Sequence, residues 1–441
     1  MVVVVWVPPA KWLGHFGSCL LLLLICTSEA IYTTPRVCEY LCNPLPAVSI
    51  ADGCVCGIER PTGFAAGGLS YDAFYGIPFA KPPVDQLRFA NPVPIGVYKD
   101  IHNGSFPRGI CIQKNDFSPN AQIQGDEDCL HLNVYRPKNM NGTLPVMVYI
   151  HGGGFIGGSA HPSYLGPEKF MSTEKVILVT PQYRLGVFGF LSTRDREAPG
   201  NFGLKDQVLA LQWVQQNIGA FGGDPTQVTI FGSSSGASSV QFHMMSPSSE
   251  GLFSKAMMLS GSALAFWNEP SEDSEFLAQD QVYVLGVGGR EEMTSKQIIE
   301  ILRLVDAEDL LASIDKLKVW HTQPSILYTP VVEKYAGGGA FLVEDPKKIW
   351  REGRYQKVPW MMGYVPNEGS IASVRILNDP ALLDELIQLQ RRYLPLFSNT
   401  TRKHAMDLYE RFFQGNRMNV DNSDGFGKVT YKKKKTYSIQ K

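Results

Sequence analysis

The sequence predicts an α/β fold in which a mostly parallel central sheet is flanked by helices. Short apolar runs rich in Val, Ile and Met alternate with helical patterns along most of the 441 residues. No internal repeat or low-complexity linker interrupts this order after the N-terminal cysteines. The 44% hydrophobic content excludes a disordered chain, and the net charge of −1 gives no electrostatic reason to expect a nucleic-acid partner. We therefore expect one large α/β domain.

The N-terminus has the pattern of an export signal. Residues 1–28 contain no Asp or Glu, and the apolar run Cys19–Cys26 precedes Ser28-Glu29-Ala30, which resembles a small-x-small cleavage site. The run is too short to span a bilayer comfortably, although Val2–Val7 adds apolar residues upstream and leaves an uncleaved anchor as the alternative. Residues 1–30 are expected to be a signal peptide, which predicts a secreted, extracellular chain without a stable membrane span after cleavage.

Secretion changes the interpretation of the cysteines. Cys19 and Cys26 leave with the signal, and six of the eight cysteines remain, an even number in an oxidising compartment. Four of them form a Cys-containing N-terminal segment over residues 31–57, and their pairing is left open: Cys38, Cys42, Cys54 and Cys56. Zinc is the alternative, but the cluster lacks a nearby His and CxxC spacing, so neither a metal nor a cofactor is expected. Three sequons mark candidate glycosylation sites: Asn103, Asn141 and Asn399.

The main domain is expected to contain at least five buried strands and three helices. The strands are Val146–Ile150, Val176–Thr180, Val228–Phe231, Ala256–Ser260 and Val358–Met362. The helices are Lys205–Ile218, a segment that starts at Asp379-Pro380 and runs through Tyr393, and about Thr401–Phe413.

A strand that enters a tight serine-containing turn is the most informative segment. Val228–Phe231 leads into Gly232-Ser233-Ser234-Ser235-Gly236, and a helical pattern follows. This strand–turn–helix arrangement of Gly-x-Ser-x-Gly is typical of a nucleophile elbow. Ser234 is therefore the candidate nucleophile, and the Ser235 N–H at the helix start is a candidate oxyanion donor. A Ser/Gly-rich turn without chemistry is the alternative.

A triple glycine follows an earlier strand. Leu144–Ile150 precedes His151-Gly152-Gly153-Gly154-Phe155, where the glycines let backbone N–H groups approach a substrate carbonyl. A glycine-rich phosphate cradle is the alternative, but neither GKS/T nor a helix start follows. The two motifs therefore stand in the order that an acyl-transfer site requires.

These motifs resemble the type-B carboxylesterase family of α/β hydrolases, which includes carboxylesterases, insect esterases and cholinesterases. Matching segments between about residues 50 and 415 include Tyr75–Pro83, Leu87–Phe89, Asp126–Val134, Tyr183–Gly186 and Phe221–Pro225. The resemblance implies an α/β-hydrolase domain over residues 58–415, with the last part of the domain missing, followed by a non-family basic tail over residues 416–441.

The resemblance implies a serine carboxylic-ester hydrolase that acts through an acyl-enzyme intermediate. Ser234 would be the nucleophile, and Glu368 the acid that orients a catalytic histidine. The oxyanion donors would be the N–H groups of Gly153, Gly154 and Ser235. The resemblance also implies a disulfide between Cys111 and Cys129, and buried ion pairs of Arg88 with Glu127 and of Arg184 with Asp206.

Two features depart from the family pattern. Ser233 precedes the nucleophile where relatives usually carry an acidic or amide side chain. His404 is the one histidine that follows Glu368, and its periodicity places it within a helix, where the geometry does not suit a catalytic base. The alternative function is therefore a catalytically impaired or non-catalytic secreted or adhesion protein.

The basic run Lys432–Lys435 fits a membrane contact, or a solvated tail from a splice variant or an incomplete gene model.

The substrate class is only coarsely indicated. Cholinesterases carry a choline-binding Trp between the two loop cysteines, whereas Cys111–Cys129 contains no Trp. We therefore expect a small or apolar carboxylic ester rather than acetylcholine. The physiological ester and the oligomeric state are not predicted.

Overall fold

The computed structural model describes residues 35–388 with gaps at 64–67, 99, 118–120, 269, 271–272, 290–292, 319–323, 336–338, 367, 369–377, 383 and 386–387. Several expectations lie outside the described residues: the signal peptide over 1–30, the sequon at Asn399, the helix at about 401–413 with His404, and the basic tail. The helix expected from Pro380 through Tyr393 is described only in part.

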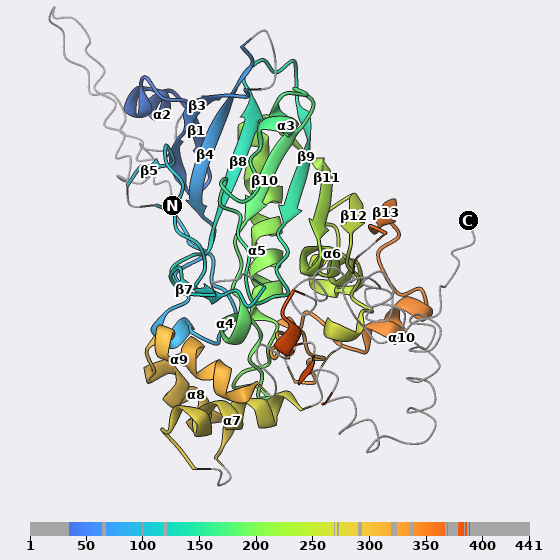
Figure 1. The fold of residues 1–441 in the computed structure, drawn as a ribbon. Helices are drawn as coiled ribbons and strands as arrows, with labels where there is room; N and C mark the ends of the chain where they lie inside the picture. The colour runs from blue at the N-terminus through green and yellow to red at the C-terminus, as the bar shows by residue number, and fades with distance from the viewer. Residues whose placement is uncertain are drawn as a thin grey trace, which may run out of the picture.

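An eight-stranded sheet forms the centre of the described structure, in the order β13-β12-β11-β9-β10-β8-β4-β3 (Figure 1). Five neighbouring strands run parallel: β9 (Leu144–Ile150), β10 (Ile177–Pro181), β11 (Gly223–Ser233), β12 (Lys255–Leu259) and β13 (Trp360–Gly363). Three more continue the sheet in antiparallel pairing: β8 (His131–Pro137), β4 (Ser70–Pro78) and β3 (Ile58–Pro61). The predicted α/β class with a mostly parallel sheet is confirmed.

Both faces of the sheet are buried, as the apolar strands require. The larger core includes Phe74 and Ile77 of β4 together with α5 (Phe202–Asn217) and α6 (Ser235–Met245). The opposite face carries a smaller cluster, in which Tyr71 of β4 packs with Met171 of α3 (Glu168–Met171).

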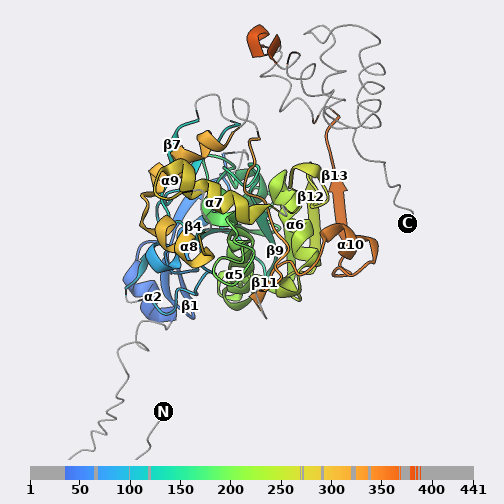
Figure 2. The same cartoon turned by 90° about the horizontal axis from the view of Figure 1, so that it is seen from below.

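Further helices lie around this framework. In Figure 1, α7, α8 and α9 gather at the lower end of the molecule, and Figure 2 shows the same group from below, with α10 beside β13. Their bounds are Ser274–Leu285 for α7, Ser295–Leu304 for α8, Ala307–Ser313 for α9 and Pro346–Arg351 for α10. The short helix α4 covers Gly186–Phe190, and η5 covers Ile314–Leu317 directly after α9.

The boundaries of several elements differ from the sequence-based expectation. The helix expected from Lys205 begins earlier, at Phe202, because Asn201 adopts φ +57 and separates the helix from the preceding turn. The strand expected over Val358–Met362 is found at Trp360–Gly363. Pro359 has no N–H to donate, although its carbonyl accepts from the Ala256 N–H at 3.1 Å.

The cysteines of the N-terminal segment form two disulfides. Cys38–Cys54 and Cys42–Cys56 tie α2 (Pro35–Cys42) to β2 (Gly53–Cys56), so the pairing that the sequence left open is settled here. β2 lies between β1 (Ala47–Ile50) and β5 (His102–Asn103) in a small sheet. With their sulfurs in disulfides, these cysteines are not zinc ligands, and within the described residues no cluster suited to a metal ion is found.

Three interactions implied by the family resemblance are present. Cys111 and Cys129 form a disulfide. The Arg88 Nε donates to Glu127 at 2.7 Å, and the Arg184 Nε donates to Asp206 at 2.8 Å. Across the described ranges, no helix is long and apolar enough to cross a membrane.

Candidate active site

Ser234 occupies a strained turn between β11 and α6. Its backbone has φ +58 and ψ −123, a combination that non-glycine residues rarely adopt and that costs on the order of 1–3 kcal/mol. The turn is held by two backbone hydrogen bonds: the Ser234 N–H donates to the Leu259 carbonyl at 2.9 Å, and the Ser234 carbonyl accepts from the Ser238 N–H at 3.0 Å. The strand–turn–helix geometry expected for a nucleophile elbow is therefore present.

The glycines on either side of Ser234 are required by the close approach of the chain. A Cβ atom on Gly232 would lie 2.6 Å from the Ile150 carbonyl oxygen at the end of β9, and one on Gly236 would lie 2.1 Å from the same atom. Both distances are shorter than real Cβ contacts, and the clashing group is backbone that cannot rotate away. The Gly-x-Ser-x-Gly pattern therefore reflects the packing of the elbow against β9.

The triple-glycine loop lies directly against the elbow. A Cβ atom built on Gly152 would lie 3.1 Å from the Ser234 Cβ. Gly153 and Gly154 adopt φ +116 and φ +65, and within the described residues their N–H groups have no hydrogen-bond acceptor. Ser235 is the first residue of α6, so its N–H also lacks an acceptor within the helix. The structure thus brings Ser234, Ser235 and the glycine loop together.

A glutamine that the sequence analysis missed connects the Cys111–Cys129 loop to the glycine loop. The fully buried Gln113 side chain donates from Nε2 to the Gly158 carbonyl at 2.9 Å, and its Oε1 accepts from the Gly158 N–H at 2.8 Å. Gln113 stands two positions after Cys111, outside any recognisable motif. Only the proximity of the disulfide to this residue could have drawn attention to it.

Glu368 and Ser234 both lie beyond the carboxyl ends of the parallel strands. The strand register pairs Ser233 of β11 with Leu259 of β12, and Leu259 with Gly363 of β13, so the following residues leave the sheet at one edge. The half-exposed Glu368 carboxylate accepts from the Val365 N–H at 2.9 Å. Among the residues that the structure describes, no hydrogen bond links a histidine to Ser234 or Glu368, and His404 is not among those residues.

The described histidines nearest to the two motifs have structural contacts. His151, which begins the glycine loop, donates from Nδ1 to the Gly152 carbonyl at 2.9 Å and stacks on Tyr183 with ring centroids 4.3 Å apart. Burial lowers the pKa of His151 to about 4. His243 on α6 is fully buried between Ser249 and Gln207, and burial lowers its pKa to about 3. Both rings are therefore neutral at physiological pH.

Comparison with known proteins agrees with the motifs. The model of the carboxylesterase family matches residues 44–431, a range that begins inside the N-terminal cysteine segment and ends inside the expected basic tail. The chain is 42% identical over 358 residues to juvenile hormone esterase of Tribolium castaneum, covering 80% of this chain and 60% of that protein. It is 40% identical over 328 residues to esterase FE4 of Myzus persicae, covering 72% of this chain and 56% of that protein.

A solved structure shows the same fold. The crystal structure of juvenile hormone esterase from Manduca sexta, with OTFP covalently attached, superposes with a TM-score of 0.72 at 28% identity. The match covers 87% of this chain and 72% of that one. The chain spans 60% or less of the length of the two curated relatives named above.

Proposed function

Because the chain belongs to the carboxylesterase family, we propose that the protein is a serine carboxylic-ester hydrolase that acts on small or apolar esters. The observation that carries this proposal is the contact between the strained Ser234 elbow and the glycine loop. A bare Ser/Gly-rich turn would not need backbone N–H groups from a second loop beside its central serine.

The proposed reaction forms and then hydrolyses an acyl-enzyme. The Ser234 oxygen attacks the ester carbonyl carbon, and the N–H groups of Gly153, Gly154 and Ser235 stabilise the oxyanion that develops. Collapse of this intermediate breaks the bond to the alcohol, which leaves with a proton, and water then releases the acid. Glu368 is proposed to orient the histidine that transfers these protons.

Secretion belongs to the same proposal. The three disulfides suit an oxidising compartment, and the Asn103 and Asn141 side chains are exposed on the surface as glycosylation requires. The Ser105 hydroxyl donates to the Asn103 side-chain oxygen at 2.7 Å within the first sequon. We propose a signal peptide over 1–30, a cysteine segment over 31–57, a hydrolase domain over 58–415 and a basic tail over 416–441.

The acyl-enzyme itself gives a direct test. After prolonged exposure of the 441-residue chain to p-nitrophenyl acetate, mass spectrometry should find an acetyl group on the peptide that contains Ser234. Ser234→Ala should lose this acetyl group, whereas Ser233→Ala, a change at the neighbouring half-buried serine, should keep it. Equal acetylation of the Ser234→Ala chain would show that the proposal is wrong.

A catalytically impaired or non-catalytic secreted protein is the second candidate. The observation that favours it is the Glu368 carboxylate, whose partner is a backbone N–H and not, within the described part of the chain, a histidine. This candidate predicts that Ser234 stays unacetylated under conditions in which a known serine esterase is fully acetylated.

A further inference from the structure

Two apolar side chains lie against the glycine loop beside Ser234. A Cβ atom on Gly154 would lie 2.6 Å from the Phe117 ring and 3.1 Å from the Ile326 Cδ1. Phe117 comes from the Cys111–Cys129 loop and keeps 43% of its surface exposed. Ile326 comes from a distant segment that follows η5. Both side chains therefore lie against Gly154, whose N–H is one of the three proposed oxyanion donors.

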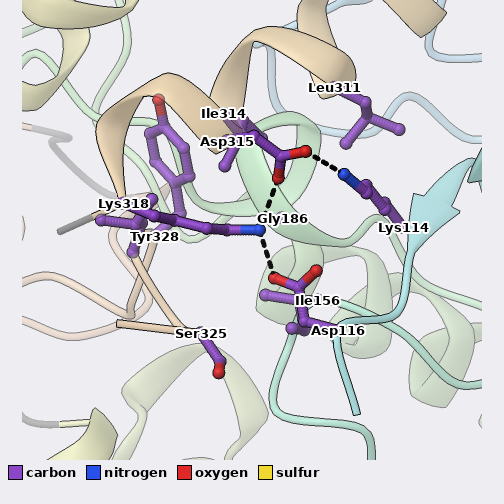
Figure 3. Close-up of a pocket in the computed structure, with 11 residues that line it drawn as sticks. Lys114, Asp116, Ile156, Gly186, Leu311, Ile314, Asp315, Lys318, Ser325 and Tyr328 are labelled. Atoms are coloured by element: carbon purple, nitrogen blue, oxygen red, sulfur yellow. Dashed lines mark hydrogen bonds and ion pairs between the residues drawn. The ribbon is translucent and has the colours of Figure 1, made fainter. Parts of the chain in front are cut away.

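A buried ion pair fixes the residue next to Phe117. The Lys318 ammonium lies 2.6 Å from the Asp116 carboxylate, and the two side chains are only 4% and 6% exposed. Lys318 also pairs with Asp315 at 2.6 Å, and Asp315 pairs with Lys114, so four charges of alternating sign form one row (Figure 3). Burial disfavours the ionised Asp315, but hydrogen bonds from Lys114 and Lys318 outweigh it and hold its pKa below the ordinary value.

The row joins the two segments that carry the apolar side chains. Lys114 and Asp116 belong to the disulfide loop, whereas Asp315 and Lys318 belong to η5 and its end, which precede Ile326. Farther along, the buried Tyr328 hydroxyl donates to the Gln281 side chain of α7 at 2.6 Å and anchors the Ile326 segment. The backbone segments that carry Phe117 and Ile326 are therefore both held in place by polar contacts, and these contacts lie outside the proposed carbonyl site.

The row of charges is not itself a substrate site. The cavity that these residues line measures about 30 Å³, which holds a water or two but is far below the volume of ligand pockets. A buried ion pair contributes little net stability, but loss of one partner leaves an unpaired buried charge and forces the local structure to rearrange. Such a pair is suited to fixing geometry.

We propose that the Asp116–Lys318 ion pair holds Phe117 against Gly154, so that Phe117 and Ile326 form a wall that limits the size of the group beside the ester carbonyl. This inference rests on the function proposed above. Phe117 and Ile326 are specificity-determining residues, and Asp116 and Lys318 are positioning residues that act through Phe117.

Two carbonyl probes of different size test the wall without requiring turnover. Binding of trifluoroacetone and of trifluoroacetophenone to the 441-residue chain is measured by fluorine NMR, and the ratio of the two dissociation constants is compared between variants. Phe117→Ala should shift this ratio about tenfold in favour of the aryl ketone, since removal of one wall group changes discrimination by at least that factor. Lys318→Met should shift the ratio in the same direction. Lys318→Arg, which keeps the positive charge, should keep the wild-type ratio.

Matched controls test whether the loss of any aromatic ring or any lysine changes the ratio of the two dissociation constants. Phe106→Ala removes a ring of similar exposure, 48%, elsewhere on the surface, and Lys296→Met removes a lysine from an exposed ion pair on α8. Both should leave the ratio unchanged. An unchanged ratio in Phe117→Ala, with binding that still depends on Ser234, overturns this inference alone. Binding that Ser234→Ala does not weaken overturns the proposed function and this inference with it.

Discussion

The buried His243 makes the stability of the fold depend on pH. Its ring lies within α6 with no exposed surface, and its Nε2 donates to the Gln207 side-chain oxygen at 2.9 Å. With the proton on Nε2, Nδ1 accepts from the Ser249 hydroxyl at 2.7 Å. The ring of Phe341 packs edge-on at a centroid distance of 5.3 Å. All of these partners are neutral, so none of them compensates a positive charge on the ring.

The sign and size of the effect follow from burial. Burial lowers the pKa of His243 from 6.5 to about 3, so the folded chain keeps the ring neutral while the unfolded chain takes up a proton below pH 6.5. The contribution of the neutral His243 ring to the free energy of unfolding is therefore fully present above pH 6.5, and it is lost as the pH falls toward 3. At about 1.4 kcal/mol per pH unit, His243 should cost the fold about 2 kcal/mol at pH ~5.

Urea unfolding of the wild type and of His243→Gln at pH 7.5 and pH 5 measures this term. The substitution removes the titrating ring. From pH 7.5 to pH 5, the free energy of unfolding of His243→Gln should therefore fall by about 2 kcal/mol less than that of the wild type. Comparing the change with pH cancels the constant cost of the altered hydrogen bonds. His161→Gln, at a partly exposed position, should give a smaller difference. An equal loss of stability in the wild type and His243→Gln would show that protonation of the buried ring does not destabilise the fold.

Three further outcomes are expected. Mass spectrometry of the expressed product should find an N-terminus near Ile31 and glycan on at least one of the three sequons; an intact Met1 without glycan would contradict secretion. Peptide mapping should recover Cys111 linked to Cys129, and replacing both by Ser should lower the free energy of unfolding by roughly 3 kcal/mol on the chain-entropy model, a loss that urea titration would detect. The 441-residue chain should hydrolyse an activated aryl ester at a rate only about 10³–10⁴-fold above that of the reaction in water. A family-type C-terminal segment with its histidine should raise that rate and make it depend fully on Ser234. Full activity without this segment, lost on His404→Ala, would instead identify His404 as the base.

Much of the fold and the central part of the site were predictable because their signals are local. Apolar runs identify buried strands, and β9, β10, β11, β12 and β13 all lie within or close to the expected ranges. The Gly-x-Ser-x-Gly turn is recognisable because only glycine tolerates the Ile150 carbonyl oxygen 2.6 Å (Gly232) and 2.1 Å (Gly236) from its missing Cβ. The boundaries were less accurate, since the start of α5 depends on the left-handed Asn201 and the start of β13 follows Pro359.

The α/β class, the order of the motifs, and the residue types that form an elbow and a glycine loop can all be deduced from the amino-acid sequence. Tertiary structure decided what those residues contact: the pairing of Cys38 with Cys54, the clamp of Gln113 on Gly158, and the row of charges that ends beside Phe117. The reason is physical. Periodicity and glycine content reflect constraints between near neighbours in the chain, whereas a contact such as Asp116–Lys318 joins segments about 200 positions apart and exists only after the domain has folded around them.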